Sequence, residues 1–172
     1  MGEGDFPLPC VFWRNMMVFE LAKPEDFAAV NRLARQVNRH HAQWDKDLDP
    51  EAEVYPLDWF QDFTKEGAIY ENALYVARLD GKVVGFMRFY IWYTNSSVTA
   101  RRAMLQIDDF GVEEELRNQG IGHKMVDALK KLARKEGCAA INLYVDAPNE
   151  SAIAFYQSCG LEIRNHGMTM TL

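Results

Sequence analysis

The chain has 172 residues, of which 48% are hydrophobic and 26% charged, and this suits one compact domain with a sizeable core. Its formal net charge of −6 argues against nucleic acid as a partner, because phosphate backbones attract basic surfaces. The three cysteines include no C-x-x-C pair and no apolar run is long enough to cross a membrane, so we expect a cytoplasmic protein without a disulfide framework, metal site or membrane partner.

The first part of the chain predicts an extension, a strand and a helix. Residues 1–16 carry glycines and prolines without a hydrophobic period, so we expect an N-terminal extension before a domain of residues 17–172. Met17 to Leu21 reads as a short strand, and a helix begins at Pro24, because proline suits the first helical turn. The apolar stripe of this helix consists of Phe27, Val30, Leu33, Ala34 and Val37.

The middle of the chain predicts an antiparallel meander. It follows an acidic loop from Asp45 to Tyr55 and a second helix. The pair Asp80-Gly81 stands between two apolar runs, Leu74 to Leu79 and Lys82 to Tyr93, which is a strong hairpin signal. Thr99 to Val112 is predicted to return as the third strand.

The last third predicts a crossover to a further strand. A helix from Gly122 to Glu136 leads to a strand that begins at Ala140, and Asn149 caps a short helix after it. Leu161 to Ile163 and Met168 to Leu172 are the final predicted strands. The order β-α-α-β-β-β-α-β-α-β-β predicts a single-domain α/β fold, a mixed twisted sheet with helices on both faces.

The stretch Arg117-Asn118-Gln119-Gly120-Ile121-Gly122 lies between the meander and the crossover helix. Two glycines at such a turn let the backbone approach a ligand, and the free N–H groups of the first helical turn attract phosphate. Arg117 adds a charge that can pair with phosphate bidentately. It is neither a Walker loop nor a dinucleotide fingerprint, because His123 follows Gly122 and Met125 replaces the third glycine.

These residues give the chain a resemblance to the GNAT N-acetyltransferase superfamily. Three motifs carry it in order: a strand end, the glycine turn and a short-helix motif. They are Phe110-Gly111-Val112, Arg117-x-x-Gly120-x-Gly122 and Asn149-x-x-Ala152-x-x-Phe155-Tyr156. Glu114 stands where the family often has proline and Leu116 where it has an aromatic residue, and both departures leave the turn intact.

The resemblance implies acetyl-CoA as co-substrate and an amine as acceptor. In the family the turn cradles the pyrophosphate, while the preceding strand and the asparagine contact the pantetheine. The tyrosine of the short helix lies near the thioester sulfur. The donor-binding residues implied here are Phe110, Gly111, Val112, Arg117, Asn118, Gln119, Gly120, Ile121, Gly122, His123, Asn149 and Tyr156.

Acetyl transfer also needs an acid and a base. A lysine-like amine, with a pKa of about 10.4, must lose a proton before it attacks, and the departing thiolate benefits from gaining one. Tyr156 is the candidate acid, against the alternative of a packed tyrosine. Asp108 is the candidate base, since some amine-acetylating family members carry a carboxylate four residues before the valine. Asp108 and Asp109 should lie on opposite faces of their strand, so at most one faces the cleft.

Other polar and aromatic groups favour plainer interpretations. His40 and His41 are adjacent and cannot share one helix face, which favours a solvated helix end over a metal or base site. The acidic loop is more typical of a solvated segment than of a device that attracts amines. Five aromatic residues could wall an acceptor pocket, although such residues are usually core. They are Trp44, Tyr55, Trp59, Tyr90 and Trp92.

The sequence thus predicts an acetyl-CoA-dependent N-acetyltransferase for a small cationic primary amine. Tyr144 stands where the family's protein N-terminus acetyltransferases tend to keep a glutamate, which disfavours a peptide acceptor. Three alternatives stay open: a non-catalytic acyl-CoA-binding module, a protein N-terminal acetyltransferase, and a transferase of longer acyl groups. The sequence also leaves a homodimer open.

Overall fold

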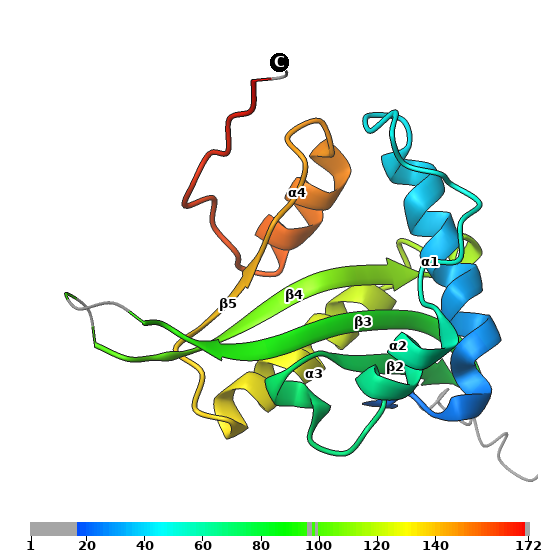
Figure 1. The fold of residues 1–172 in the computed structure, drawn as a ribbon, viewed down its shortest axis with the longest axis horizontal. Helices are drawn as coiled ribbons and strands as arrows, with labels where there is room; N and C mark the ends of the chain where they lie inside the picture. Colours follow the sequence, from blue (N-terminus) through cyan, green and yellow to red (C-terminus); the bar gives the residue numbers. More distant parts are fainter. Residues whose placement is uncertain (1–16, 96–97, 99, 171–172) are drawn as a thin grey trace, which may run out of the picture.

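A computed structural model describes residues 17–95, 98 and 100–170 (Figure 1). In that part of the chain five strands form one sheet in the order β1-β2-β3-β4-β5. They are β1 (Met17–Leu21), β2 (Ala73–Leu79), β3 (Lys82–Tyr93), β4 (Ala103–Val112) and β5 (Ala140–Leu143). The first four strands pair antiparallel, and β5 pairs parallel with β4, which confirms the predicted mixed sheet.

Four α-helices and three 3₁₀ turns accompany the sheet in the described residues. The helices are α1 (Phe27–His41), α2 (Leu57–Phe63), α3 (Ile121–Lys135) and α4 (Glu150–Ser158). The 3₁₀ turns are η1 (Pro24–Asp26), η2 (Ala68–Tyr70) and η3 (Glu114–Leu116). None of these helices is long and apolar enough to cross a membrane.

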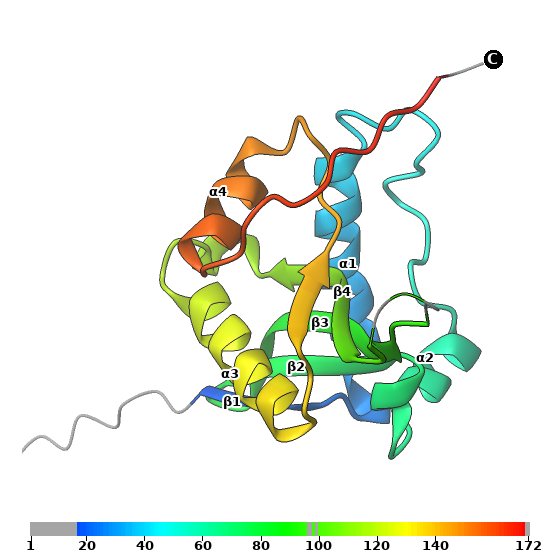
Figure 2. The same ribbon diagram turned by 90° about the vertical axis from the view of Figure 1, so that its left-hand side faces the viewer.

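The helices cover both faces of the sheet, as predicted, because side chains alternate along each strand (Figure 2). Leu74 of β2 packs in a cluster with Leu33 of α1 and Phe60 of α2. Its neighbour Ala73 points to the opposite face, into the cluster that contains Leu129 of α3. The sheet therefore separates two apolar layers and holds α1 and α3 at fixed positions.

The hairpin between β2 and β3 has the predicted turn. Asp80 and Gly81 have φ angles of 49° and 81°, and positive φ at both central residues is the mark of the type I′ turn that matches strand twist. This fixes the register of the meander and so the residues of β3 that face β4.

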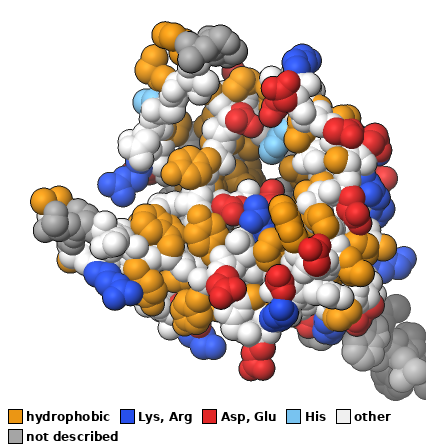
Figure 3. All heavy atoms as spheres, in the orientation of Figure 1, with side chains coloured by type: hydrophobic (Ala, Val, Ile, Leu, Met, Phe, Trp, Pro, Cys, Tyr) orange, Lys and Arg blue, Asp and Glu red, His pale blue; other side chains and the backbone are white. Residues whose placement is uncertain are grey.

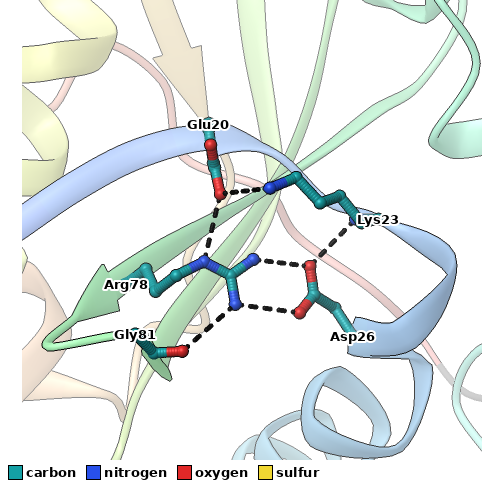
Figure 4. Close-up of polar contacts among 5 residues, drawn as sticks. All are labelled: Glu20, Lys23, Asp26, Arg78 and Gly81. Carbon is teal, nitrogen blue, oxygen red and sulfur yellow. Dashed lines mark hydrogen bonds and ion pairs between the residues drawn. The ribbon is translucent and has the colours of Figure 1, made fainter.

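An ion-pair network ties β1 to β2 (Figure 4). Arg78 contacts Glu20 at 3.0 Å and Asp26 at 2.9 Å, and the backbone N–H of Lys23 donates to Asp26 at 2.9 Å. Asp26 is only 3% exposed, so its charge depends on these partners. None of these residues lines the cleft described below.

Strand β4 extends beyond its pairing with β5. The parallel pairing runs from Met104 opposite Ala140 to Ile107 opposite Leu143 and then stops. Figure 1 shows β5 and α4 diverging from β4 beyond this point. Within the described residues, the backbone of residues 108–112 therefore has no strand partner on its β5 side, where the Val112 carbonyl accepts a hydrogen bond from Arg117, although it remains paired with β3 on the other side.

The two final predicted strands are wrong where the structure describes them. Residues 161–170 contain no strand, and residues 171–172 lie outside the described part. Ile163, Met168 and Met170 are 56%, 98% and 83% exposed, because their short apolar runs meet no face on which to pack. The predicted extension of residues 1–16 also lies outside the described residues, and the domain boundary stays a prediction.

Candidate active site

A cleft of about 430 Å³ opens where β4 and β5 part. Its walls come from the end of α1, the last residues of β4, the turn before α3, the segment after β5 and the start of α4. The space-filling view shows a hollow between α4 and α1 with charged and histidine side chains around it (Figure 3). All the predicted site residues except Gln119 and Ile121 border this cleft.

The glycine turn has the geometry of an anion site. Gly120 stands at the N-cap of α3 with φ of 80°, a conformation that favours glycine, and Asn118 has φ of 61°. The first amide of α3 that bonds within the helix is that of Lys124, which donates to the Gly120 carbonyl at 3.1 Å. The amides of residues 121–123 precede it and have no side-chain cap, so they are available to a phosphate.

Gly122 also allows two helices to pack closely. A Cβ at this position would lie 3.0 Å from the ring of Phe155 and 3.5 Å from that of Phe110. These two rings stack on each other with centroids 5.4 Å apart. Gly122 therefore allows the first turn of α3 to pack directly on α4 and on the end of β4.

Arg117 lies at the mouth of the cleft. Its Nε donates to the carbonyl of Val112 at 3.2 Å, and its Nη1 lies 3.7 Å from a carboxylate oxygen of Glu114. Both contacts are at exposed positions, where an ion pair contributes little and a phosphate can compete for the guanidinium.

A clamp that sequence reasoning missed fastens α1 to the residues before the turn. Glu113 accepts hydrogen bonds from Arg32 at 2.7 Å and from Gln36 at 2.6 Å, and the N–H of Glu114 donates to Gln36 at 3.2 Å. The hydrogen bond from Arg32 holds the pKa of Glu113 below its usual range. Glu113 is 81 and 77 residues away from Arg32 and Gln36 in the sequence, so no local pattern signals the clamp.

Asp108 and Asp109 lie together, contrary to the expectation of opposite faces. The register between β3 and β4 shifts after Arg88, which pairs with Asp109, and Phe89 then pairs with Ile107. Asp108 is thus the extra residue of a β-bulge, and the bulge re-aims its side chain. Arg88 contacts Asp109 at 2.7 Å through Nε and Asp108 at 2.9 Å through Nη1.

The two carboxylates differ in their surroundings. Asp109 also accepts a hydrogen bond of 2.6 Å from the hydroxyl of Tyr55, which is buried and has its pKa raised by that burial. Burial raises the pKa of Asp108, while the charge of Arg88 opposes this effect. Asp109 is therefore held by two hydrogen-bond partners, Arg88 and Tyr55, whereas the contact found for Asp108 is with Arg88.

Tyr156 stands on α4, half-buried against the ring of Phe110, with centroids 6.1 Å apart. Burial raises the pKa of its phenol above the ordinary tyrosine value, so the hydroxyl stays protonated at neutral pH. Tyr156 borders the cleft, and no hydrogen bond joins its hydroxyl to another residue that the structure describes.

Asn149 caps α4 as predicted. Its side-chain oxygen accepts from the N–H of Ala152 and from the hydroxyl of Ser151, both at 3.1 Å. The residue is buried and borders the cleft. Its oxygen is thus committed to the helix, and only its amide N–H groups are available for the contact with the donor that the resemblance implies.

His40 and His41, which the sequence predicts at a solvated helix end, both border the cleft. They occupy the last turn of α1, half-buried, with ring centroids 4.9 Å and 6.2 Å from that of Trp44. Two adjacent side chains can border one cleft here because the cleft lies across the helix end. The apolar stripe of α1 carries no signal of this position.

The other weak candidates do not line the cleft. Of the five aromatic residues considered above, Tyr55 is buried core and Trp59 is 55% exposed outside the cleft. In the acidic loop, Glu51 pairs with Arg39 at 2.8 Å, and Asp45 and Asp49 accept from nearby backbone N–H groups. The loop is therefore an exposed, locally bonded segment.

Comparison with known proteins supplies the wider context. A model of the acetyltransferase (GNAT) family matches residues 34–161. A thialysine N-epsilon-acetyltransferase of Bos taurus is 30% identical over 80 residues, which cover 46% of this chain and 45% of the relative. An N-alpha-acetyltransferase of Sulfurisphaera tokodaii is 31% identical over 115 residues, covering 64% of this chain and 66% of the relative.

A solved structure has the same fold. A tetramutant protein from Bacillus halodurans superposes with a TM-score of 0.82 at 23% identity, over 90% of this chain and 99% of that protein. The chain spans about half the length of the first curated relatives it matches.

Proposed function

We propose that this chain, which belongs to the acetyltransferase (GNAT) family, is an acetyl-CoA-dependent N-acetyltransferase that acts on a small cationic primary amine. One observation carries the proposal. The anion site at the start of α3, the unpaired edge of β4, a protonated phenol and a carboxylate with raised pKa all border one cleft.

The donor fits the residues present. The first-turn amides of α3 and Arg117 suit the pyrophosphate, since both offer positive charge and N–H donors. The free backbone edge of residues 108–112 suits an extended amide-containing chain, which can add to a strand edge by hydrogen bonds. The same amides provide donors for the oxygen of the thioester carbonyl as charge develops on it.

The chemistry then needs only groups of this chain and the two substrates. Asp108 accepts a proton from the ammonium group of the acceptor, and the free amine forms a bond to the thioester carbon. The bond between carbon and sulfur breaks, and the phenol of Tyr156 donates its proton to the departing thiolate. The attached nitrogen loses its second proton to solvent, Asp108 releases its proton to solvent, and Tyr156 regains one, so that the products are an amide, free CoA and one net proton.

The charge at the cleft supports a cationic acceptor. Arg88 contributes one positive charge and Asp108 and Asp109 two negative charges, which leaves one net negative charge for an ammonium group. A protein N-terminal amine is the second candidate, because the relative from Sulfurisphaera tokodaii is an N-alpha-acetyltransferase. The relative from Bos taurus acts on thialysine, a small amine, and supports the first.

The experiment is a panel of acceptors with acetyl-CoA, followed by detection of the released thiol. Small diamines, amino acids with side-chain amines, aminoglycosides and short peptides with free N-termini represent the acceptor classes. We expect turnover with small cationic amines and little with peptides. Turnover with peptides alone would favour the second candidate, and donor binding without turnover would favour a non-catalytic module. The cytoplasmic setting and a homodimer stay predictions.

A further inference from the structure

We propose that Arg88 is a positioning residue that holds Asp108 at the cleft in its ionised form, ready to accept a proton. This inference rests on the proposed function, in which Asp108 is the base. Arg88 lies on β3. Its guanidinium contacts the carboxylates of Asp108 and Asp109, the side-chain amide of Asn72 and the ring of Phe63.

The guanidinium is fixed from several sides. Nη1 donates to the side-chain oxygen of Asn72 at 2.8 Å, and Nε contacts Asp109 at 2.7 Å. The ring of Phe63 lies 5.6 Å from the guanidinium carbon. A planar group held this way loses little freedom when it makes a further contact. The remaining contact is that of Nη1 with Asp108 at 2.9 Å.

The bulge makes this arrangement possible. In a regular strand, two consecutive residues point to opposite faces and cannot meet one guanidinium on the adjacent strand. The extra residue in β4 turns Asp108 to the side of Asp109, so that Arg88 contacts both. Asp109 accepts a second hydrogen bond, from the hydroxyl of Tyr55. In the described part of the chain, the polar contact of the Asp108 carboxylate is with Arg88. The rest of the Asp108 carboxylate is thus left for the acceptor.

Arg88 also sets the protonation of Asp108. Without the arginine, burial and the charge of Asp109 would both favour the protonated carboxyl, which cannot act as a base. Several elements contribute titratable groups that interact with Asp108 or border the cleft beside it. These groups are Arg88, Tyr90, Asp109, His40, His41, Tyr144, Asp146 and Tyr156. Among the residues that the structure describes, only Arg88 contacts both carboxylates, so its removal tests this effect.

The test compares Arg88→Gln and Arg88→Lys with Arg78→Gln. Arg78 is a matched control, because it also bridges two carboxylates, Glu20 and Asp26, but lies outside the cleft. The first measurement follows the carboxyl carbon of Asp108 by NMR in carbon-13-labelled protein without substrates. We expect Arg88→Gln to raise the pKa of Asp108 by about one pH unit or more. Arg88→Lys keeps the charge and should recover most of the wild-type value, and Arg78→Gln should leave it unchanged.

The second measurement is the pH dependence of kcat/KM with the best acceptor. The acidic limb of the profile should move to higher pH in Arg88→Gln by the same amount as the NMR value. In Arg88→Lys the acidic limb should stay near the wild-type position. kcat should fall, because the lysine ammonium cannot reproduce the directed hydrogen bonds of the planar guanidinium. The dissociation constant of acetyl-CoA should not change in either variant.

The two proposals fail differently. A raised pKa of Asp108 in Arg88→Gln, with no acetyl transfer in the wild-type protein, would keep the role of Arg88 and overturn the proposed reaction. An unchanged pKa in folded Arg88→Gln would overturn the role of Arg88, whatever the activity. If Arg88→Gln does not fold, Arg88→Lys decides: a wild-type kcat in that variant would contradict the positioning role, whereas a lower kcat with the wild-type pH profile would support it.

Discussion

The ring of Phe155 on α4 occupies the space that a side chain at Gly122 on α3 would need, with ring atoms 3.0 Å from the position of a Cβ. This contact joins the two helices that flank the donor side of the cleft. Because Gly122 belongs to the turn that binds the pyrophosphate in our account, the packing of the helices and the shape of the anion site depend on each other.

We expect Gly122→Val to weaken both the fold and the donor site. The added carbons must displace Phe155 and its stacking partner Phe110, and overpacking of this kind costs about 1–3 kcal/mol. The dissociation constant of acetyl-CoA should rise and the Tm should fall. Gly167→Val is the control, because a Cβ there meets no atom within 4 Å. Unchanged affinity and Tm in Gly122→Val would show that the contact has no such role.

A negative charge in the turn should reduce donor affinity. We expect Gly120→Asp to raise the dissociation constant of acetyl-CoA at least about 10-fold, because the carboxylate would repel the pyrophosphate at the helix N-terminus. Gly137→Asp is the matched control. Gly120 and Gly137 have φ of 80° and 70°, and both have open space around them, so the two substitutions carry similar backbone strain. Calorimetry that finds equal affinities in both variants would rule out this turn as the pyrophosphate site.

Tyr156→Phe should slow the chemical step and leave binding intact. The substitution keeps the ring that packs on Phe110 and removes only the proton donor. We expect kcat to fall about 10-fold or more, since acid catalysis is worth about 10²–10⁴-fold, with the dissociation constant of acetyl-CoA unchanged. Because burial raises the pKa of Tyr156, the wild-type rate should not decline through loss of this proton near neutral pH. An unchanged kcat would make Tyr156 a packing residue.

The rate should depend on ionic strength and on Asp108. Attraction between a cationic acceptor and the net negative cleft is screened by salt, so kcat/KM should fall as ionic strength rises. Asp108→Asn should lower kcat, raise KM for the acceptor, or both. Rates indifferent to salt and to Asp108→Asn would direct the search to neutral or anionic acceptors.

The clamp of Glu113 should stabilise the fold in a pH-dependent way. Because hydrogen bonding lowers the pKa of Glu113 in the folded state, its contribution is present above the unfolded pKa, near 4.5, and is lost as pH falls through the folded value. We therefore expect Glu113→Gln to lower the Tm more at pH 7 than at pH 3. Thermal unfolding at the two pH values measures this, and an equal loss at both would assign the effect to packing.

The sequence predicted features that depend on neighbours along the chain. Asp80-Gly81 demands a tight turn, Gly120 adopts a conformation that favours glycine, and Asn149 caps the helix that follows it. Each of these outcomes is decided by a few consecutive residues. The residues proposed for the donor side were named from the resemblance to the GNAT superfamily, whose motifs here include two of these local features, the glycine turn and the Asn149 cap.

Features that depend on pairing between distant residues were missed. The bulge at Asp108 reflects a shift of one residue between β3 and β4, and one such shift reverses the direction of a side chain. Arg88 lies in a mostly apolar strand. The sequence pattern shows one charged residue there but does not indicate which groups it contacts. The C-terminal segment has short apolar runs, and only the folded surroundings decide whether such runs find a partner.

The central claim is that this chain transfers an acetyl group from acetyl-CoA to an amine nitrogen. The most direct measurement uses acetyl-CoA with an isotope-labelled acetyl group, a cationic primary amine selected from the panel, and mass spectrometry of the products together with thiol detection. Our account predicts labelled acetyl on the amine nitrogen, with one free CoA thiol for each acetylated amine, and a strong reduction of both in Tyr156→Phe. Binding of acetyl-CoA without formation of any acetylated amine across all acceptor classes would contradict it.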